Sequence, residues 1–319
     1  MRKISFLFII ALALFGCETK KDTTNIAIVS IVEIDPIKQL RDGFMNTLKN
    51  SEHYDSTQIR FTEFNAQGEE VLISQIVDQI ITARPELVYV LGTPISQAIQ
   101  KRDSSIVIVQ GAVTDPIAAG LADAWKGSGR NYAANSDLPP VNRQLALIRD
   151  MFPDAKKLGV LYNVGETNSV AIVNRLRNKT EEFSFNLIER SANNSAEIPS
   201  AVESLIGNVD ALYIPPDNTI HSNMRVVGKV CNENKIPLFT TTSETVGFGA
   251  TAVMGMDFYK LGEEAGTIAV KILFENVNPG EIPIAFSEKP QVLINKNALS
   301  QFSLDSSELR TKWNYDLVE

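Results

Sequence analysis

The fold is decided by residues 60–94, "RFTEFNAQGEEVLISQIVDQIITARPELVYVLGTP", because residues 186–218, "NLIERSANNSAEIPSAVESLIGNVDALYIPPDN", repeat their pattern. Each stretch begins with an apolar run typical of a strand and continues through a small polar turn into a helical pattern. Each then ends in a second hydrophobic strand, followed by a turn that contains proline. Strand, helix and strand in this order form the unit of parallel sheets. The repetition therefore predicts two similar α/β halves.

The same alternation extends outward from these stretches over most of the chain. It begins with "NIAIVSIV" (25–32) and "IKQLRDGFMNTLKN" (37–50), and it restarts after "NYAANSDLPP" (131–140) with "KLGVLYN" (157–163). This order predicts parallel sheets with helices on both faces. About 300 residues with 44% apolar content also suffice for two domains. Two facing Rossmann-like lobes would place the carboxyl ends of their strands around a shared ligand-binding cleft.

Several motifs resemble the ABC transporter substrate-binding lipoproteins of the tryptophan/tyrosine-type binding protein family, which have the type I periplasmic-binding-protein fold. They are "LGTPISQAI", "VTDPIAAGL", "SDLPPVNRQLALIRDMFPDAKKLGVLYNVGETNSVA", "VDALYIPPDNTI" and "MGMDFYKLGEEAG", within residues 25–300. The resemblance implies capture of a small solute, often an aromatic amino acid, for delivery to a membrane permease. It also implies two lobes joined by three crossings. We expect residues 25–135 and 258–286 in lobe 1, and 136–257 and 287–319 in lobe 2.

The N-terminus has the features of a secretion signal. Arg2 and Lys3 precede the apolar run of residues 4–16, which is shorter than the roughly 20 residues of a membrane span, and Cys17 follows at once. "LFGC" resembles the bacterial lipobox, so we expect removal of residues 1–16, lipidation of Cys17 and a polar tether over residues 17–24. The lipid would hold the protein on the extracytoplasmic side of a membrane, periplasmic or at the cell surface. The alternative is an ordinary secretion signal in which the cysteine is incidental.

Composition bears on the remaining function classes. The formal charge is −8 for the whole chain and −10 without Arg2 and Lys3, so nucleic acid is not an expected partner. Two histidines and no cysteine–histidine cluster predict no metal site, and we expect no cofactor and no disulfide. No phosphate loop or nucleophile motif indicates an enzyme. We expect a monomeric binding protein, with a sensory role beside a membrane receptor as the alternative to transport.

Loops at the ends of predicted strands supply the first candidate ligand-binding residues. In "LGTPIS", we expect Thr93 to cap a helix whose first-turn N–H groups are also suited to a ligand carboxylate. In "LYNVGETNS", the resemblance implies that Asn163, Glu166, Asn168 and Ser169 belong to a ligand-contacting loop. Turn and cap residues without a ligand contact would show the same composition.

The second group of candidates lies at the expected crossings and at the end of a later strand. Ser136 and Asp137 lie at the first crossing, where they would contact ligand or cap the helix that begins near residue 139. Asp217 and Asn218 follow "DALYIPP", and Asp257 lies at the second crossing. We expect Asp217 to pair with the ammonium group of an amino acid. Capping by an acidic residue at a helix start is the alternative for both aspartates.

One departure from the family pattern affects the expected pocket. Family members usually have Glu-His-Pro at this place. In "IVEIDPIKQL", Glu33 is kept, but Ile34 and Asp35 replace the two residues expected after it. Glu33 is therefore a further candidate for ligand binding, while the identity of the ligand is left open. Three apolar residues would either line the pocket or belong to the core, namely Phe248, Met254 and Phe258.

Overall fold

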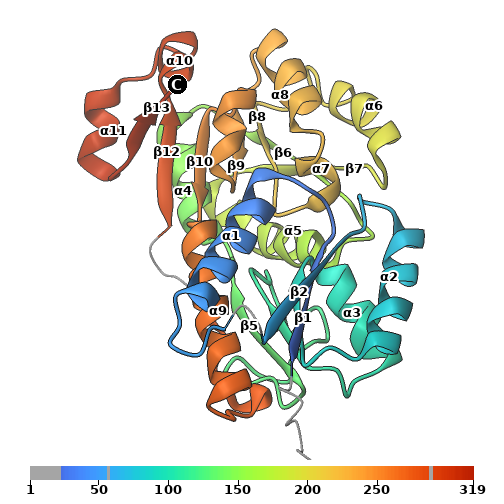
Figure 1. The fold of residues 1–319 in the computed structure, drawn as a ribbon. Coiled ribbons are helices and arrows are strands. Elements are labelled where there is room, and N and C mark those ends of the chain that lie inside the picture. Colours follow the sequence, from blue (N-terminus) through green and yellow to red (C-terminus); the bar gives the residue numbers. More distant parts are fainter. Residues whose placement is uncertain (1–22, 56–57, 287–289) are drawn as a thin grey trace, which may run out of the picture.

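The structure is a computed structural model that describes residues 23–55, 58–286 and 290–319, and it consists of two α/β lobes (Figure 1). The predicted signal peptide and Cys17 lie outside the described residues. The strands of each lobe form a sheet, and helices cover both sheets. The expected fold class is therefore confirmed.

The first sheet is parallel throughout, with the strand order β11-β5-β4-β3-β1-β2. Its strands are β1 (Thr24–Ser30), β2 (Ile59–Asn65), β3 (Leu87–Leu91), β4 (Ile108–Gln110), β5 (Tyr132–Ser136) and β11 (Ala285–Phe286).

The second sheet has the order β13-β12-β10-β9-β8-β6-β7. Its strands are β6 (Lys157–Tyr162), β7 (Asn186–Ser191), β8 (Ala211–Tyr213), β9 (Leu238–Thr240), β10 (Ala252–Gly255), β12 (Gln291–Asn295) and β13 (Asp316–Val318). The order β5-β4-β3-β1-β2 in the first sheet matches β10-β9-β8-β6-β7 in the second, so the repeat that the sequence predicts is present. Strand β12 is a departure from the expected parallel pairing, because it runs antiparallel to β10.

The helices connect the strands of both sheets. Lobe 1 carries α1 (Asp35–Lys49), α2 (Glu70–Ala83), α3 (Thr93–Arg102) and α9 (Phe258–Phe274). Lobe 2 carries α4 (Val141–Met151), α5 (Thr167–Lys179), α6 (Ile198–Glu203), α7 (Asn218–His221), α8 (Met224–Glu233), α10 (Lys296–Gln301) and α11 (Ser306–Lys312). Four 3₁₀ turns complete the fold, η1 (Thr180–Phe183), η2 (Ser195–Glu197), η3 (Ser243–Phe248) and η4 (Pro279–Glu281).

The chain passes between the two sheets three times, after β5, after β10 and after β11. The third passage includes residues 287–289, which lie outside the described part. This strand membership accords with the lobes that we expect from the sequence, and the lobe limits themselves stay a proposal. The second passage leads into α9, which returns to lobe 1 and packs against α1 (Figure 1).

Two glycines allow α1 and α9 to lie in close contact. A Cβ atom on Gly43 would collide with the backbone oxygen of Tyr259, and one on Gly262 would collide with the backbone oxygen of Leu40. Glycine is therefore required at both positions by the distance between the helices. The contact fixes the start of α1, which forms part of the site described below.

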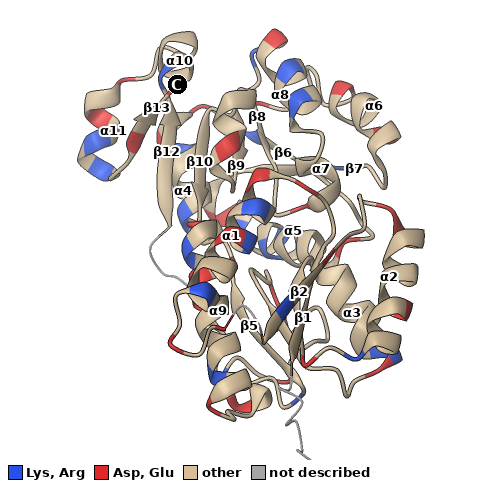
Figure 2. Cartoon of the chain, viewed as in Figure 1, with Lys and Arg blue, Asp and Glu red and all other residues tan. Residues whose placement is uncertain are grey.

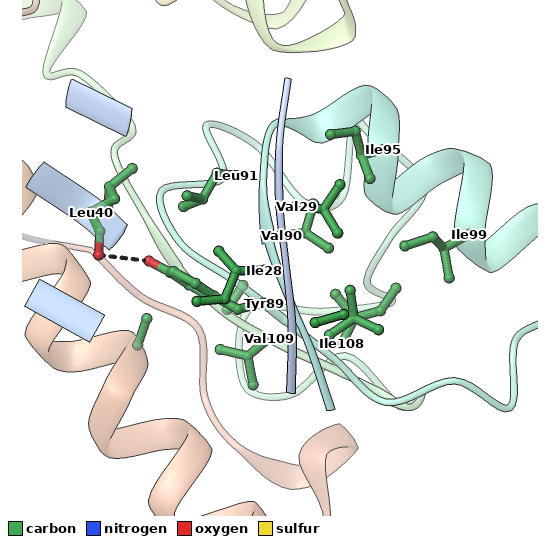
Figure 3. Close-up of a cluster of buried hydrophobic side chains, with 14 of the residues drawn as sticks. Ile28, Val29, Leu40, Tyr89, Val90, Leu91, Ile95, Ile99, Ile108 and Val109 are labelled. Carbon is green, nitrogen blue, oxygen red and sulfur yellow. Dashed lines mark hydrogen bonds between the residues drawn. The ribbon is translucent and has the colours of Figure 1, made fainter. Parts of the chain in front are cut away.

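The core of lobe 1 contains Tyr89, a fully buried residue of β3 (Figure 3). Its ring stacks on Phe44 with a centroid distance of 3.8 Å, and its hydroxyl donates to the Leu40 backbone oxygen at 3.2 Å. The buried hydroxyl thus has the partner that burial requires. Two further apolar clusters, which include Val160 and Leu212 respectively, form the core of lobe 2.

Charged residues lie mostly on the helices and connecting loops, while the strands are largely uncharged (Figure 2). This distribution is that of a water-exposed surface around apolar cores. Within the described ranges, every helix is too short or too polar to cross a membrane.

Candidate functional site

A cavity of about 60 Å³ lies between the two lobes. Lobe 1 contributes residues from the start of α1 and from the ends of β3 and β4, namely Ile34, Pro36, Ile37, Leu40, Gly92, Thr93, Gly111, Ala112 and Thr114. Lobe 2 contributes Asn168, Pro216, Asp217, Asn218, His221, Thr241 and Thr242, while Asp137 and Phe258 come from the first two crossings. The cavity thus occupies the position that the two facing α/β sheets predict.

The two sides of the cavity differ in chemistry. The lobe 1 side has an apolar wall in which Ile37 and Leu40 of α1 lie with Phe258. The lobe 2 side is mainly polar, because its residues follow the carboxyl ends of β6, β8 and β9. A ligand with one apolar end and one polar end matches this division.

Asp217 holds the loops of lobe 2 together. Its carboxylate accepts hydrogen bonds from the backbone N–H groups of Asn163, at 2.6 Å, and Ile220, at 2.8 Å, and from the Ser169 hydroxyl at 2.7 Å. It is also the N-cap of α7, so the capping alternative is confirmed. Burial and the nearby Glu166 carboxylate raise the pKa of Asp217, and the hydrogen bonds oppose this rise.

Glu166 fixes the adjacent start of α7 from behind the cavity. Its Oε1 accepts from the backbone and hydroxyl of Thr219, at 2.9 and 2.7 Å. Its Oε2 accepts from the backbone and side-chain amides of Asn218, at 2.8 and 2.7 Å, and from Asn168 Nδ2 at 3.2 Å. These five donors satisfy the buried carboxylate.

Asp137 has a different environment at the first crossing. Among the described residues, one side-chain donor contacts it, the Thr114 hydroxyl at 2.9 Å from Oδ1. Burial raises the pKa of Asp137 to about 7, while the Thr114 hydrogen bond opposes the rise. No lysine or arginine occurs among the described residues that line the cavity. Asp137 is therefore a cavity carboxylate that lacks a cationic side chain as partner.

Three helices point their first turns at the cavity, since Ile34, Thr93 and Asn168 lie at the starts of α1, α3 and α5. None of the three N-cap side chains accepts a hydrogen bond from its own helix. Backbone N–H groups at helix starts favour an anionic group, but Pro36 and Pro94 contribute none, and the Ile95 N–H already donates to the Gly92 backbone oxygen at 3.2 Å. Gly92 precedes α3 with φ of +137°, and a Cβ there would lie only 2.7 Å from the Ile31 side chain.

Two polar contacts bridge the lobes at the rim of the cavity. Arg175 of α5 forms an ion pair with Asp115 of lobe 1, with 2.8 Å between Nη2 and Oδ2. Gln97 of α3 donates to the Thr167 hydroxyl of α5 at 3.3 Å. Both contacts require the lobes to lie close together, and we call this pair of contacts the bridged rim.

The structure brings some of the predicted residues to the cavity and places others behind it. Five of them line the cavity: Thr93, Asp137, Asn168, Asp217 and Asn218. Four more are buried and support the loops around it: Ser136, Asn163, Glu166 and Ser169. A direct ligand contact of each residue stays a prediction.

Two of the predicted residues neither line the cavity nor support its loops. Glu33 forms a two-pronged ion pair with Arg41, with 2.7 and 3.1 Å between the atoms, and this pairing holds its carboxylate away. Asp257 is exposed and caps α9 by accepting from the Lys260 backbone at 3.0 Å. Its capping alternative is therefore confirmed.

The predicted cap at Thr93 is wrong, and so is the capping alternative for Ser136. The N-cap of α3 is Gly92, because the Thr93 hydroxyl instead lies 3.3 Å from Gln110 Nε2 and accepts from it. Ser136 does not cap α4 either, because its hydroxyl donates to the Thr114 backbone oxygen at 3.1 Å. Of the three apolar candidates, only Phe258 lines the cavity. Met254 belongs to the lobe 2 core, and Phe248 packs beside Arg225.

Three polar cavity residues of lobe 2 were not predicted from the sequence, namely His221, Thr241 and Thr242. The threonines follow β9 in "FTTTSE", so the rule that ligands bind at strand ends indicates them. His221 is the last residue of a four-residue helix and carries no such signal. Burial lowers the pKa of His221 to about 4, so its imidazole is neutral at pH 7.

The chain matches known proteins over nearly its whole length. The model of the family described as ABC transporter substrate binding protein matches residues 25–311. A tyrosine-binding protein of Clostridioides difficile (strain R20291) is 34% identical over 289 residues, which cover 91% of this chain and 83% of that protein.

Two solved structures show the same fold. A structure of an ABC domain in complex with L-Trp from Streptococcus pneumonia is 24% identical, with a TM-score of 0.85 over 92% of this chain and 100% of that chain. The ligand-free, open structure of a substrate binding protein with adhesive properties from Clostridium difficile is 31% identical. It covers 93% of this chain and 99% of that chain, with a TM-score of 0.70.

A two-lobed α/β chain with a cavity between its lobes defines the class of periplasmic solute-binding proteins. Within this class, the chain belongs to the family of ABC transporter substrate binding proteins. It is thus an extracytoplasmic substrate-binding protein that serves an ABC transporter.

Proposed function

We propose that this protein captures an amino acid with an apolar side chain, such as an aromatic one, in the cavity between its lobes. The main support is the cavity itself, in which the Asp137 carboxylate, which has no lysine or arginine beside it among the described cavity residues, lies together with the starts of three helices and an apolar wall. A zwitterion supplies a group for each, because its ammonium suits the carboxylate, its carboxylate suits helix N–H groups and its side chain suits the wall. The tyrosine-binding relative supports the same ligand class.

The lobes would open to admit the ligand and close upon it. The supporting observations are the three passages between the sheets and the bridged rim formed by Arg175–Asp115 and Gln97–Thr167. The lower TM-score against the open relative accords with a closed arrangement here. We place residues 25–135 and 258–286 in the first moving body, and 136–257 and 287–319 in the second.

The delivery step would use a membrane permease, with the protein held at the membrane by a lipid on Cys17. The support is the family membership and the sequence "LFGC". A monomer suffices for this role, because both lobes that contribute to the cavity are parts of the same chain.

A thermal-shift panel of the twenty amino acids, with nucleosides and simple amines as comparison compounds, tests the proposal. A ligand at 100 times its Kd adds about 2.7 kcal/mol to the free energy of unfolding. We expect stabilisation by amino acids with apolar side chains. Stabilisation by a nucleoside or an amine alone would reject the amino acid as ligand.

A further inference from the structure

Five buried side-chain atoms of the described residues have no hydrogen-bond partner, and three of them belong to residues that line the cavity. These three are Asn168 Oδ1, His221 Nε2 and Thr241 Oγ1. The exposed fraction of each residue is 7% or less. Buried polar atoms are nearly always paired, so three unpaired atoms on residues that line one cavity point to a polar ligand group there.

The three atoms come from the ends of three neighbouring strands. Asn168 follows β6, His221 follows β8 and Thr241 follows β9, and the sheet has these strands in the order β9-β8-β6. The atoms therefore lie along one edge of lobe 2, on the polar side of the cavity.

The role of Asn168 is set by its other contacts. Its Nδ2 donates to the Pro216 backbone oxygen at 2.9 Å and to Glu166 Oε2 at 3.2 Å. Both partners are acceptors, so this end of the amide must be the NH₂ group. Oδ1 is consequently an acceptor, and it requires a donor such as an ammonium N–H.

His221 and Thr241 each offer one more hydrogen bond. His221 Nδ1 lies 3.0 Å from the Thr242 hydroxyl, and the ring also interacts with the Pro215 backbone, while Nε2 has no hydrogen-bond partner among the described residues. The Thr241 hydroxyl both donates and accepts. Asp217, by comparison, already receives three hydrogen bonds from the protein.

We propose that Asn168, His221 and Thr241 are the lobe 2 contacts of the ligand's α-amino acid head group. Asn168 Oδ1 accepts a hydrogen bond from the ammonium, and His221 Nε2 and Thr241 Oγ1 bind the same head group. This inference rests on the proposed function. It adds that the three residues, rather than Asp217, determine recognition of the head group on this side.

The first test measures the affinity of the full chain for L-tyrosine by calorimetry in Thr241→Val and Ser96→Ala. Valine keeps the shape of threonine and removes the hydroxyl. Ser96 is the matched control, because its buried hydroxyl is also unpartnered but does not line the cavity. We expect roughly 10- to 100-fold weaker binding in Thr241→Val, the range for a hydrogen bond to a charged group, and unchanged binding in Ser96→Ala. Equal affinity of the wild type and Thr241→Val would overturn the assignment of Thr241.

A pair of variants tests His221. Gln places an amide near the position of Nε2, and Asn places one near the position of Nδ1, beside Thr242. We expect His221→Gln to keep most of the affinity for L-tyrosine and His221→Asn to lose at least tenfold. The opposite order, or no loss in either variant, would overturn the role of Nε2.

The ammonium contact is tested by comparing L-tyrosine with 3-(4-hydroxyphenyl)propanoate, which lacks the amino group. Wild type should prefer tyrosine, and Asn168→Leu should reduce this preference at least tenfold. Circular dichroism checks that Asn168→Leu folds, and the other variants test the site if it does not. Tyrosine binding that is unaffected by all three substitutions would overturn the inference alone. A wild type that binds no amino acid would reject both the inference and the proposed function.

Discussion

Asp137→Asn should change stability and ligand affinity in opposite directions. In the ligand-free protein, burial raises the pKa of Asp137 to about 7, against an ordinary value of 3.8. The folded state therefore keeps this proton up to about pH 7, whereas the unfolded chain loses it near pH 4. As pH rises from 4 to 8, the unfolded state is favoured and the ligand-free protein loses stability.

Asparagine has no proton to lose, and its side-chain oxygen still accepts from the Thr114 hydroxyl. At pH 8 we expect Asp137→Asn to raise the free energy of unfolding by about 1–3 kcal/mol, after allowance for the partial exposure of the side chain. Urea unfolding measures the change. Asp154→Asn, at an exposed site, is the matched control and should show no change.

Ligand binding should respond in the opposite way, because an ammonium pairs with the ionised carboxylate. With a pKa of about 7 in the free protein, affinity for L-tyrosine should fall about 90-fold between pH 8 and pH 5. His221 stays neutral over most of this range, because its pKa is about 4. Asp217 and Glu244, whose pKa values are also raised, remain in the variant, so the difference from wild type isolates Asp137.

Calorimetric titrations at pH 5, 6, 7 and 8 measure this dependence. Asp137→Asn should bind more weakly at pH 8 and show a smaller decline towards pH 5. A variant that binds as tightly as wild type, with the same pH profile, would refute the reasoning. A variant that is less stable at pH 8 would show instead that the Asp137 carboxylate has a structural role.

Three further predictions follow from the remaining contacts. Asp217→Ala leaves two backbone N–H groups and the Ser169 hydroxyl without their acceptor. We expect it to lower the free energy of unfolding, measured with urea, by about 2–4 kcal/mol. A decrease of less than about 1 kcal/mol would contradict the described network. Asp115→Asn removes an exposed ion pair worth about 0.2–1 kcal/mol, so ligand affinity should fall at most about fivefold, and less at high salt; a salt-independent effect would exclude an electrostatic contribution of the rim. Cys17→Ala should move the protein from the membrane fraction to the soluble fraction or leave its signal uncleaved, and equal partitioning of both forms would reject the lipid anchor.

Much of the fold is predictable from the sequence, because each strand–helix unit carries its own hydrophobic pattern. The match between residues 60–94 and 186–218 appears in the structure as two sheets with the same strand order. The antiparallel strand β12 is less predictable, because its direction depends on where the third crossing delivers the chain. No local sequence pattern determines where the third crossing enters the second sheet.

The candidate site is predictable only in part, for a physical reason. Residues in the segments that connect a strand to the next helix, such as Asn168 and Asp217, are indicated because parallel strands end at one edge. The choice between facing the cavity and facing a neighbour depends on distant contacts. Glu33 pairs with Arg41 on the surface, while His221 is brought to the cavity by a short helix whose start is fixed by Asp217 and Glu166.

A calorimetric comparison of L-tyrosine with tyramine and with 3-(4-hydroxyphenyl)propanoate tests the central claim most directly. The three compounds share an aromatic side chain and differ only in the charged groups that the cavity is proposed to bind. The account predicts that L-tyrosine binds at least tenfold more tightly than either analogue, since each analogue leaves one side of the charge recognition unpaired. Equal affinity for all three compounds, or no binding of L-tyrosine or any other amino acid, would contradict capture of a zwitterion between the lobes.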